Sequence, residues 1–409
     1  MENQEYNMGF EVSDELRNRL KNKGLDDDRM FALEKFHNAK KENLHHGLNI
    51  RTDLEFIDYD SSMSEGRTDI TYEHNTLFDN KSVHLIKFHE FIHDKNFDKD
   101  FKDDILRQIS GNHTSKSASG MNKLDYLHLA LSNMSLLVVE HGVSDDEFLK
   151  IDRVIEGNSY NHLVIIIRNG SKVNILIMNH HPENHSDEHA SIITDFLDVI
   201  MEKGSSAQII EERKFSAKDV VYGRKSAILG KDADMNWINI DKDSRLTMIE
   251  QHTILEGEDS KSVMNNIVCG ENSEYVMHNI SEHTGKGTES LMQNRIGLKK
   301  SKAIIKGLVK INESAFNSNG YQKSDILLLD DVSRGISIPD LEIHNDKVRC
   351  THGSTITKPD IEKIFYLQSR GLSKEESTEM LIEGFYDKIL KDINNNAIMT
   401  ELRNDVLGR

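Results

Sequence analysis

Two side chains that can bind a borderline or soft metal ion stand two residues apart late in the sequence. Cys350 and His352 are separated by a single threonine. Side chains of an extended segment alternate between its two faces, so this spacing would place the thiol and the imidazole on the same face. Ferrous iron accepts both ligand types. The alternative is that Cys350 is a buried small apolar residue and His352 a hydrogen-bonded edge residue, which are common structural roles.

A second group of potential metal ligands lies in residues 179–189, NHHPENHSDEH. Four histidines and three acidic residues are gathered there: His180, His181, His185, His189, Glu183, Asp187 and Glu188. Their spacing fits no compact structural metal site. We therefore favour a solvated insertion between a strand that ends at Met178 and a short helical stretch over residues 191–203.

Sequence motifs of the commoner enzyme classes are missing. His278 and His283 lack the His-x-His spacing of a cupin-like metal site. The sequence has no P-loop, no GxSxG, no HExxH and no GxGxxG after a strand. It therefore predicts no ATP hydrolysis by this chain, and a partner would have to supply any energy.

Composition narrows the class of protein further. The 409 residues include 69 acidic and 51 basic ones, a formal net charge of -18, which argues against a nucleic-acid partner. The two cysteines, Cys269 and Cys350, form no disulfide framework and no CxxC pair, as in a reducing cytosol. No apolar run approaches a membrane span, and residues 1–20 do not resemble a signal peptide. We expect a cytoplasmic protein without membrane contact.

The elements that must position these side chains fall into three regions. Residues 1–122 are charged, show helical spacing at 28–39 and 99–109, and end in a Ser/Gly/Asn-rich linker at 110–121. Residues 123–356 contain many short apolar runs punctuated by Gly and Asn, which predicts an all-β core. Because no repeat of 20 to 25 residues is visible, periodicity leaves a sandwich and a solenoid both open.

The third region, residues 357–409, is expected to be helical. Pro359 suits a first helical turn, and Gly371 ends the helix that follows. Ser373 and Glu376 form a capping box for the next helix. A last helix begins near Ala397, so this region should be a compact helical hairpin or bundle.

Residues 343–385 resemble the C-terminal signature of the SufB/SufD family. The matching runs are CTHG at 350–353, FYL at 365–367, SRGL at 369–372 and EGF at 383–385. Upstream, KGLVK, YQK, LLL and PDLEI are similar to the strands that precede this signature in the family, and the resemblance covers residues 303–386.

Two positions resemble the SufD branch of the family more than the SufB branch. SufB proteins carry a cysteine where this chain has Ser333, and a His-Glu pair where it has His352 and Gly353. The resemblance implies a mainly β fold: a right-handed parallel β-helix core with a helical N-terminal region, and a C-terminal segment that docks an ABC-type ATPase, SufC.

The resemblance also implies a role without catalysis of its own. A SufD-like subunit of the SUF iron–sulfur cluster assembly complex would pair with a SufB-like scaffold, or form a homodimer when alone. It would need no cofactor as an isolated chain, and His352 and Cys350 would handle iron or a nascent cluster at the shared interface. The alternatives are a SufB-like homodimeric scaffold and a β-helix or cupin-like metalloenzyme.

Overall fold

The computed structural model describes residues 121–140, 148–182 and 190–408 continuously. Of the first 105 residues it describes 26–39, 44–45, 51–52, 54, 56–57, 59, 66–73, 83–94, 97, 99, 102 and 105.

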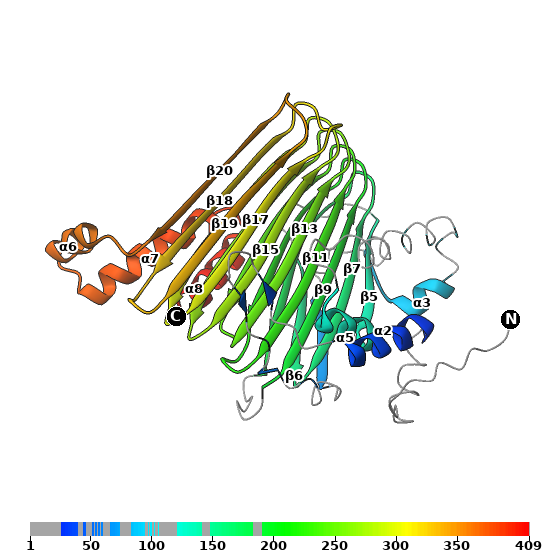
Figure 1. The fold of residues 1–409 in the computed structure, drawn as a ribbon, viewed down its shortest axis with the longest axis horizontal. Helices are drawn as coiled ribbons and strands as arrows, with labels where there is room; N and C mark the ends of the chain where they lie inside the picture. Colours follow the sequence, from blue (N-terminus) through cyan, green and yellow to red (C-terminus); the bar gives the residue numbers. More distant parts are fainter. Residues whose placement is uncertain are drawn as a thin grey trace.

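Two nine-stranded sheets form the body of the molecule, and from Asn133 onward the chain passes from one to the other after each strand (Figure 1). The β20 sheet contains, in spatial order, β20 (Arg349–Thr357), β18 (Asn319–Leu328), β16 (Glu289–Lys299), β14 (Lys261–Glu271), β12 (Asp234–Lys242), β10 (Ser206–Lys214), β8 (Lys172–His180), β6 (Phe148–Glu156) and β3 (Arg67–Glu73).

The β19 sheet contains β19 (Arg334–Ile343), β17 (Lys302–Ile311), β15 (Glu274–His283), β13 (Leu246–Leu255), β11 (Val220–Leu229), β9 (Ile192–Met201), β7 (Ser159–Ile167), β5 (Asn133–Val139) and β4 (Val83–Lys87). All neighbours from β5 to β20 pair in parallel, for example Ile209 with Trp237. This alternation of strands is a two-sheet parallel β-solenoid, so the predicted parallel β-helix is confirmed and a sandwich is excluded.

The space between the two sheets is the main hydrophobic core. It is filled by inward side chains from both sheets, such as Ile175, Leu197 and Trp237, all at most 2% exposed. Short turns join the strands from Ile192 onward, and many turn residues have positive φ, for example Asp259 at 59°. Gly, Asp and Asn tolerate this left-handed conformation better than most residues do, so these residue types recur at the turns.

One predicted element was wrong. Residues 191–203 were expected to be a short helix, but Ile192–Met201 is strand β9, with every residue buried. Both faces of β9 are covered, because Leu197 packs in the core and Phe196 packs outside against helix α5 (Lys123–Leu131). A strand buried on both faces loses the alternation of apolar and polar residues by which strands are recognised.

The N-terminal region combines helices with strands. The predicted helix at 28–39 is confirmed by α2 (Asp26–Asn38), which packs on α5, and α3 (Phe88–His93) follows β4. However, β3 and β4 extend the two sheets by antiparallel pairing, and a short ribbon joins β1 (Leu44–His45) to β2 (Arg51–Thr52). The predicted helix at 99–109 and the linker lie almost entirely outside the described residues.

Three helices follow β20: α6 (Ile361–Ser369), α7 (Lys374–Leu390) and α8 (Asn396–Leu407). Asp360 caps α6, and Ser373 with Glu376 forms the predicted capping box of α7. α7 and α8 pack on the outer face of the β20 sheet, where Ile389 and Leu402 contact Ile238 and its neighbours. By contrast, α6 buries no residue and projects beyond the β-helix (Figure 1). No helix among the described residues is both long and apolar enough to cross a membrane.

Candidate functional site

Cys350 and His352 lie on β20, the last strand of its sheet, so the predicted extended conformation and common face hold. Their register partners on β18 are Gly320 and Gln322. Cys350 is half-buried and packs against the interior core, whereas His352 is exposed. The face that they share is therefore the inward face of the strand, uncovered at the open end of the β-helix.

The thiol of Cys350 sits in a crowded position. A Cβ placed on Gly320 would lie 3.5 Å from Cys350 Sγ and 3.5 Å from His283 Nε2, and would clash with Val309. Burial raises the pKa of the Cys350 thiol to about 11, so it is protonated near neutral pH. Of the two side chains, the exposed imidazole is therefore the readier ligand.

Ser333 and Gly353 have different structural settings. Ser333 is fully buried, accepts a hydrogen bond from the Ser301 backbone N–H at 3.2 Å and donates to the Leu298 carbonyl at 3.1 Å. It joins two coils of the β-helix. A Cβ on Gly353 would reach only Tyr321 Oη, at 3.6 Å, so the fold does not require glycine there.

His180 and His181 belong to hydrogen-bond networks. His180 Nε2 lies 2.7 Å from Asp152 Oδ1, and its Nδ1 lies 2.8 Å from the His181 carbonyl. His181 Nε2 lies 2.6 Å from Asp219 Oδ2, and its Nδ1 lies 2.6 Å from the Ile155 carbonyl. All four ring nitrogens are therefore engaged, and the remaining ligands of the 179–189 segment lie outside the described residues.

His278 and His283 point to opposite faces of β15. His278 Nδ1 lies 3.6 Å from Glu250 Oε2 on the outer face, while His283 is fully buried inside. His283 Nδ1 contacts Thr288 Oγ1 at 2.7 Å and its Nε2 contacts Ser290 Oγ at 2.8 Å. The two imidazoles cannot share a metal ion. Within the described ranges, no three His, Cys, Asp or Glu side chains are placed to hold one.

Acid should destabilise the chain through His283. Burial lowers its pKa to about 4, against about 6.5 in an unfolded chain, so the unfolded state takes up the proton first. The stabilisation that comes from keeping His283 neutral is fully present above pH 6.5. As the pH falls to about 4, the free energy of unfolding decreases by roughly 3 kcal/mol. The free energy of unfolding, measured with urea, should therefore depend less steeply on pH for His283→Gln than for the wild type between these pH values. His344→Gln, at an exposed site, is the control and should retain the wild-type slope.

Sequence reasoning missed a charged cluster inside the β-helix. Arg213 Nε and Nη2 pair with both oxygens of Asp241, at 2.6 and 2.9 Å, and its Nη1 lies 2.9 Å from Glu211 Oε2. Lys225 also pairs with Glu211, and all four side chains are at most 2% exposed. Burial alone would raise the pKa of Glu211, but Arg213 and Lys225 outweigh it and hold the pKa below its usual range.

The cluster continues as a row of amides. Lys225 Nζ donates to Asn239 Oδ1 at 2.5 Å, and Asn239 Nδ2 donates to Gln251 and to Asn266. Asn266 Nδ2 in turn donates to Asn294 Oδ1 at 2.8 Å. Polar side chains thus link the two sheets over several coils, and this network holds the coils in register.

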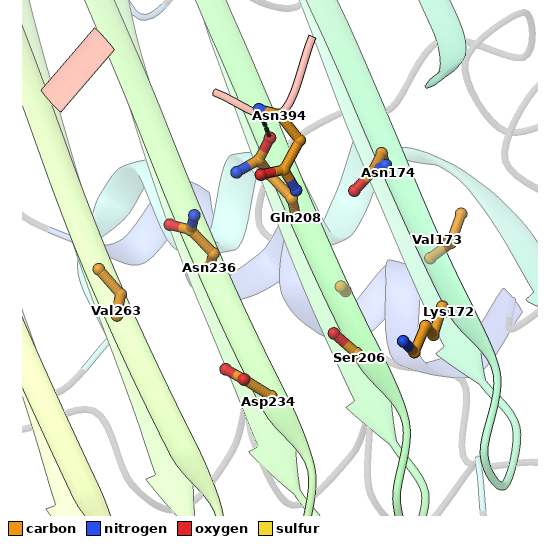
Figure 2. Close-up of a pocket in the computed structure, with 10 residues that line it drawn as sticks. Lys172, Val173, Asn174, Ser206, Gln208, Asp234, Asn236, Val263 and Asn394 are labelled. Atoms are coloured by element: carbon orange, nitrogen blue, oxygen red, sulfur yellow. Dashed lines mark hydrogen bonds between the residues drawn. The ribbon is translucent and has the colours of Figure 1, made fainter. Parts of the chain in front are cut away.

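A small polar pocket of about 270 Å³ lies on the outer face of the β20 sheet (Figure 2). Amide side chains dominate its lining, among them Asn174, Gln208 and Asn236. Gln208 Nε2 donates to the Asp392 carbonyl, and its Oε1 accepts from the Asn394 backbone N–H, so the loop between α7 and α8 closes one side. These contacts explain the pocket as part of the helix-docking surface.

Comparison with known proteins identifies the family that this chain resembles. Residues 152–385 match the model of the SufBD core domain of the SUF system for FeS cluster assembly. The iron–sulfur cluster assembly protein SufD of Bacillus subtilis (strain 168) is 27% identical over 291 residues, covering 69% of this chain and 65% of the relative.

Two further relatives give the same level of similarity. SufB of Bacillus subtilis is 27% identical over 205 residues, covering 50% of this chain and 44% of the relative. The SufBD family protein ycf24 of Porphyra purpurea is 26% identical over 245 residues, covering 58% and 50%. The chain thus spans about half to two thirds of the length of these relatives, and identity does not separate the SufB from the SufD branch.

Proposed function

Because the chain belongs to the SufB/SufD family of iron–sulfur cluster assembly proteins, we propose that it is the SufD-type scaffold subunit of a SUF complex. It pairs with a SufB-like subunit, binds an ABC-type ATPase of the SufC kind, and has no catalytic activity of its own. The observation that carries the proposal is the exposed His352 beside Cys350 at the open end of the β-helix. Ser333, a buried structural serine where SufB proteins have a cysteine, supports the SufD branch over a SufB-like homodimer.

The open end of the β-helix is suited to pairing with another subunit. β19 and β20 are the last strands of their sheets, and most of their residues are exposed or half-buried. A free strand edge offers backbone N–H and C=O groups to a further strand. A partner joined there would bring its own metal ligands next to His352. An iron ion or nascent cluster, which is the cargo of the site, requires such additional ligands. The same edge would serve a homodimer when the chain is alone.

The C-terminal segment provides the surface for the ATPase, chiefly through α6. Ile361, Phe365 and Tyr366 of α6 are 80, 72 and 56% exposed, although they are apolar or aromatic. An amphipathic helix with an uncovered apolar face typically docks into a groove of a partner. α7 and α8 are covered by their own β-sheet, so their apolar sides serve the fold of this chain.

Replacing Phe365 by aspartate should therefore abolish ATPase binding without unfolding the chain. The side chain is exposed, and a charge in an apolar interface costs several kcal/mol unless it is paired. The measurement is co-purification of the ATPase and a SufB homologue after joint expression with the full-length variant. Glu375→Lys, a charge change on the exposed start of α7, is the control. Wild-type recovery of the ATPase with Phe365→Asp would contradict the docking assignment. Loss of the SufB homologue alone would also contradict it, because it would show that Phe365 serves the subunit interface at the β20 edge.

A further inference from the structure

A cavity of about 730 Å³ lies outside the β-helix, at the C-terminal ends of β8 and β10. Helix α8 forms one wall of it with Glu401 and Asp405, and Met178 and Phe215 supply apolar surface. Its size is in the range of small-molecule pockets, which commonly combine an apolar wall with a few polar groups. In the order of the sheet, β18, β16, β14 and β12 stand between β20 and the two strands that border the cavity.

Glu212 gives this cavity an unsatisfied carboxyl group. The residue lines the cavity, is only 8% exposed, and its Oε1 has no hydrogen-bond partner among the described atoms. Burial raises the pKa of Glu212 to about 7, and the carboxylates of Asp405 and Glu401 add to the rise. A buried carboxylate without a partner is costly, so a cation bound beside it would be strongly favoured.

Lys214 and Lys242 lower the pKa of Glu212 and so offset the rise only in part, and neither donates a hydrogen bond to its Oε1. Lys214 Nζ lies 3.1 Å from Asp405 Oδ1, and Lys242 Nζ donates to the Asp405 carbonyl at 2.6 Å. Both ammonium groups are thus drawn to α8. Asp243 adds a fourth carboxylate to the cavity wall, so acidic groups outnumber the basic ones that line it.

Three observations favour an organic cation over a metal ion. No group of three ligand side chains in the described part of the chain is placed to hold a metal ion. The imidazoles of His180 and His181, which also line the cavity, already use their ring nitrogens for Asp152, Asp219 and backbone carbonyls. In addition, the cavity has room and apolar surface for a carbon chain.

We propose that this cavity binds a small organic cation, an aliphatic amine or guanidinium compound, whose charged group pairs with the carboxylate of Glu212. Glu401 of α8 holds a second positive charge, and the carbon chain lies against Met178 and Phe215. The site is separate from the cluster-assembly surface and does not depend on the function proposed above.

The test is isothermal titration calorimetry of the full chain with putrescine, spermidine, arginine and, separately, manganese chloride. The amines or arginine should bind the wild type, and Glu212→Gln should weaken binding by about tenfold or more, because a charge-assisted hydrogen bond to a buried group is lost. Glu313→Gln, an exposed carboxylate on the turn after β17, should bind like the wild type. Circular dichroism establishes that each variant is folded, and Glu401→Gln, on the exposed side of α8, replaces Glu212→Gln if that variant does not fold.

Several results would overturn the proposal. Absence of amine and arginine binding to the wild type at millimolar concentration would exclude the ligand class. Equal affinity of wild type and the Glu212 variant, or of wild type and the Glu401 variant where it is used, would place the ligand elsewhere. Binding of manganese alone would show a metal site in place of an organic-cation site.

Discussion

Replacing His352 by alanine is expected to lower iron–sulfur cluster formation by the assembled complex by about tenfold or more, since loss of even an outer-shell partner of a metal site costs that much. Folding and ATPase binding should be unchanged, because the side chain is exposed on the last strand of its sheet. The measurement is cluster yield, by ultraviolet–visible absorption, after anaerobic reconstitution of the purified complex with iron and a sulfide source.

The neighbouring residues provide matched controls for this experiment. Thr351→Ala alters an exposed side chain on the opposite face of β20 and should leave cluster yield unchanged. Cys350→Ser should have a milder effect than His352→Ala, because the thiol is half-buried and its pKa is raised to about 11. Wild-type cluster yield with His352→Ala would contradict the proposed role. Unfolding of this variant would show that the histidine serves the fold.

The strands could be predicted from the sequence, but their arrangement could not be predicted from periodicity alone. The coils of the β-helix repeat at intervals longer than 20 to 25 residues. Positive φ recurs at Gly204, Asp232, Asp259, Gly287 and Asn317, every 27 to 30 residues. Each of these residues donates its backbone N–H to a carbonyl of the next coil, for example Gly204 to Lys231 at 2.8 Å.

This repeat is concealed because three residue types fill one conformational role. Gly, Asp and Asn all tolerate the left-handed region, so no single residue type recurs at this position of each coil. A small residue usually follows: Ser205, Ala233, Ser260, Thr288 and Ser318. A search for a left-handed-tolerant residue followed by a small one would have found the solenoid. Resemblance of residues 343–385 to the SufB/SufD signature predicted the same β-helix without any use of the repeat.

The candidate site was partly predictable for a similar reason. The spacing of Cys350 and His352 placed them on one face, and that needed only the strand period. The exposure of α6 depends on where the β-helix ends relative to α7. This arrangement cannot be predicted from a local sequence pattern. Glu212 and Arg213 stand in the charged run EERK, which is typical of a solvated strand end. Only the stacking of coils shows that Arg213 points into the core and Glu212 under α8.

The charged cluster in the core should be the most sensitive point for stability. Arg213 satisfies both oxygens of Asp241 and also contacts Glu211, all without access to water. Its removal leaves the carboxylate of Asp241 without this partner and out of reach of water, whereas Glu211 keeps Lys225. Breaking a buried ion pair by deleting one partner typically costs about 3–5 kcal/mol, far more than the pair contributes relative to a well-packed apolar core.

Arg213→Met is therefore expected to lower the free energy of unfolding by about 3–5 kcal/mol, as measured by urea denaturation followed by circular dichroism. The matched control is Lys214→Met at the next residue, whose ion pair with Asp405 is half-exposed and should contribute at most about 1 kcal/mol. Adding Asp241→Asn to Arg213→Met should recover part of the loss, because the stranded carboxylate becomes neutral. A cost for Arg213→Met no larger than that for Lys214→Met would mean that water reaches the cluster, since only hydration could replace the lost partner of Asp241.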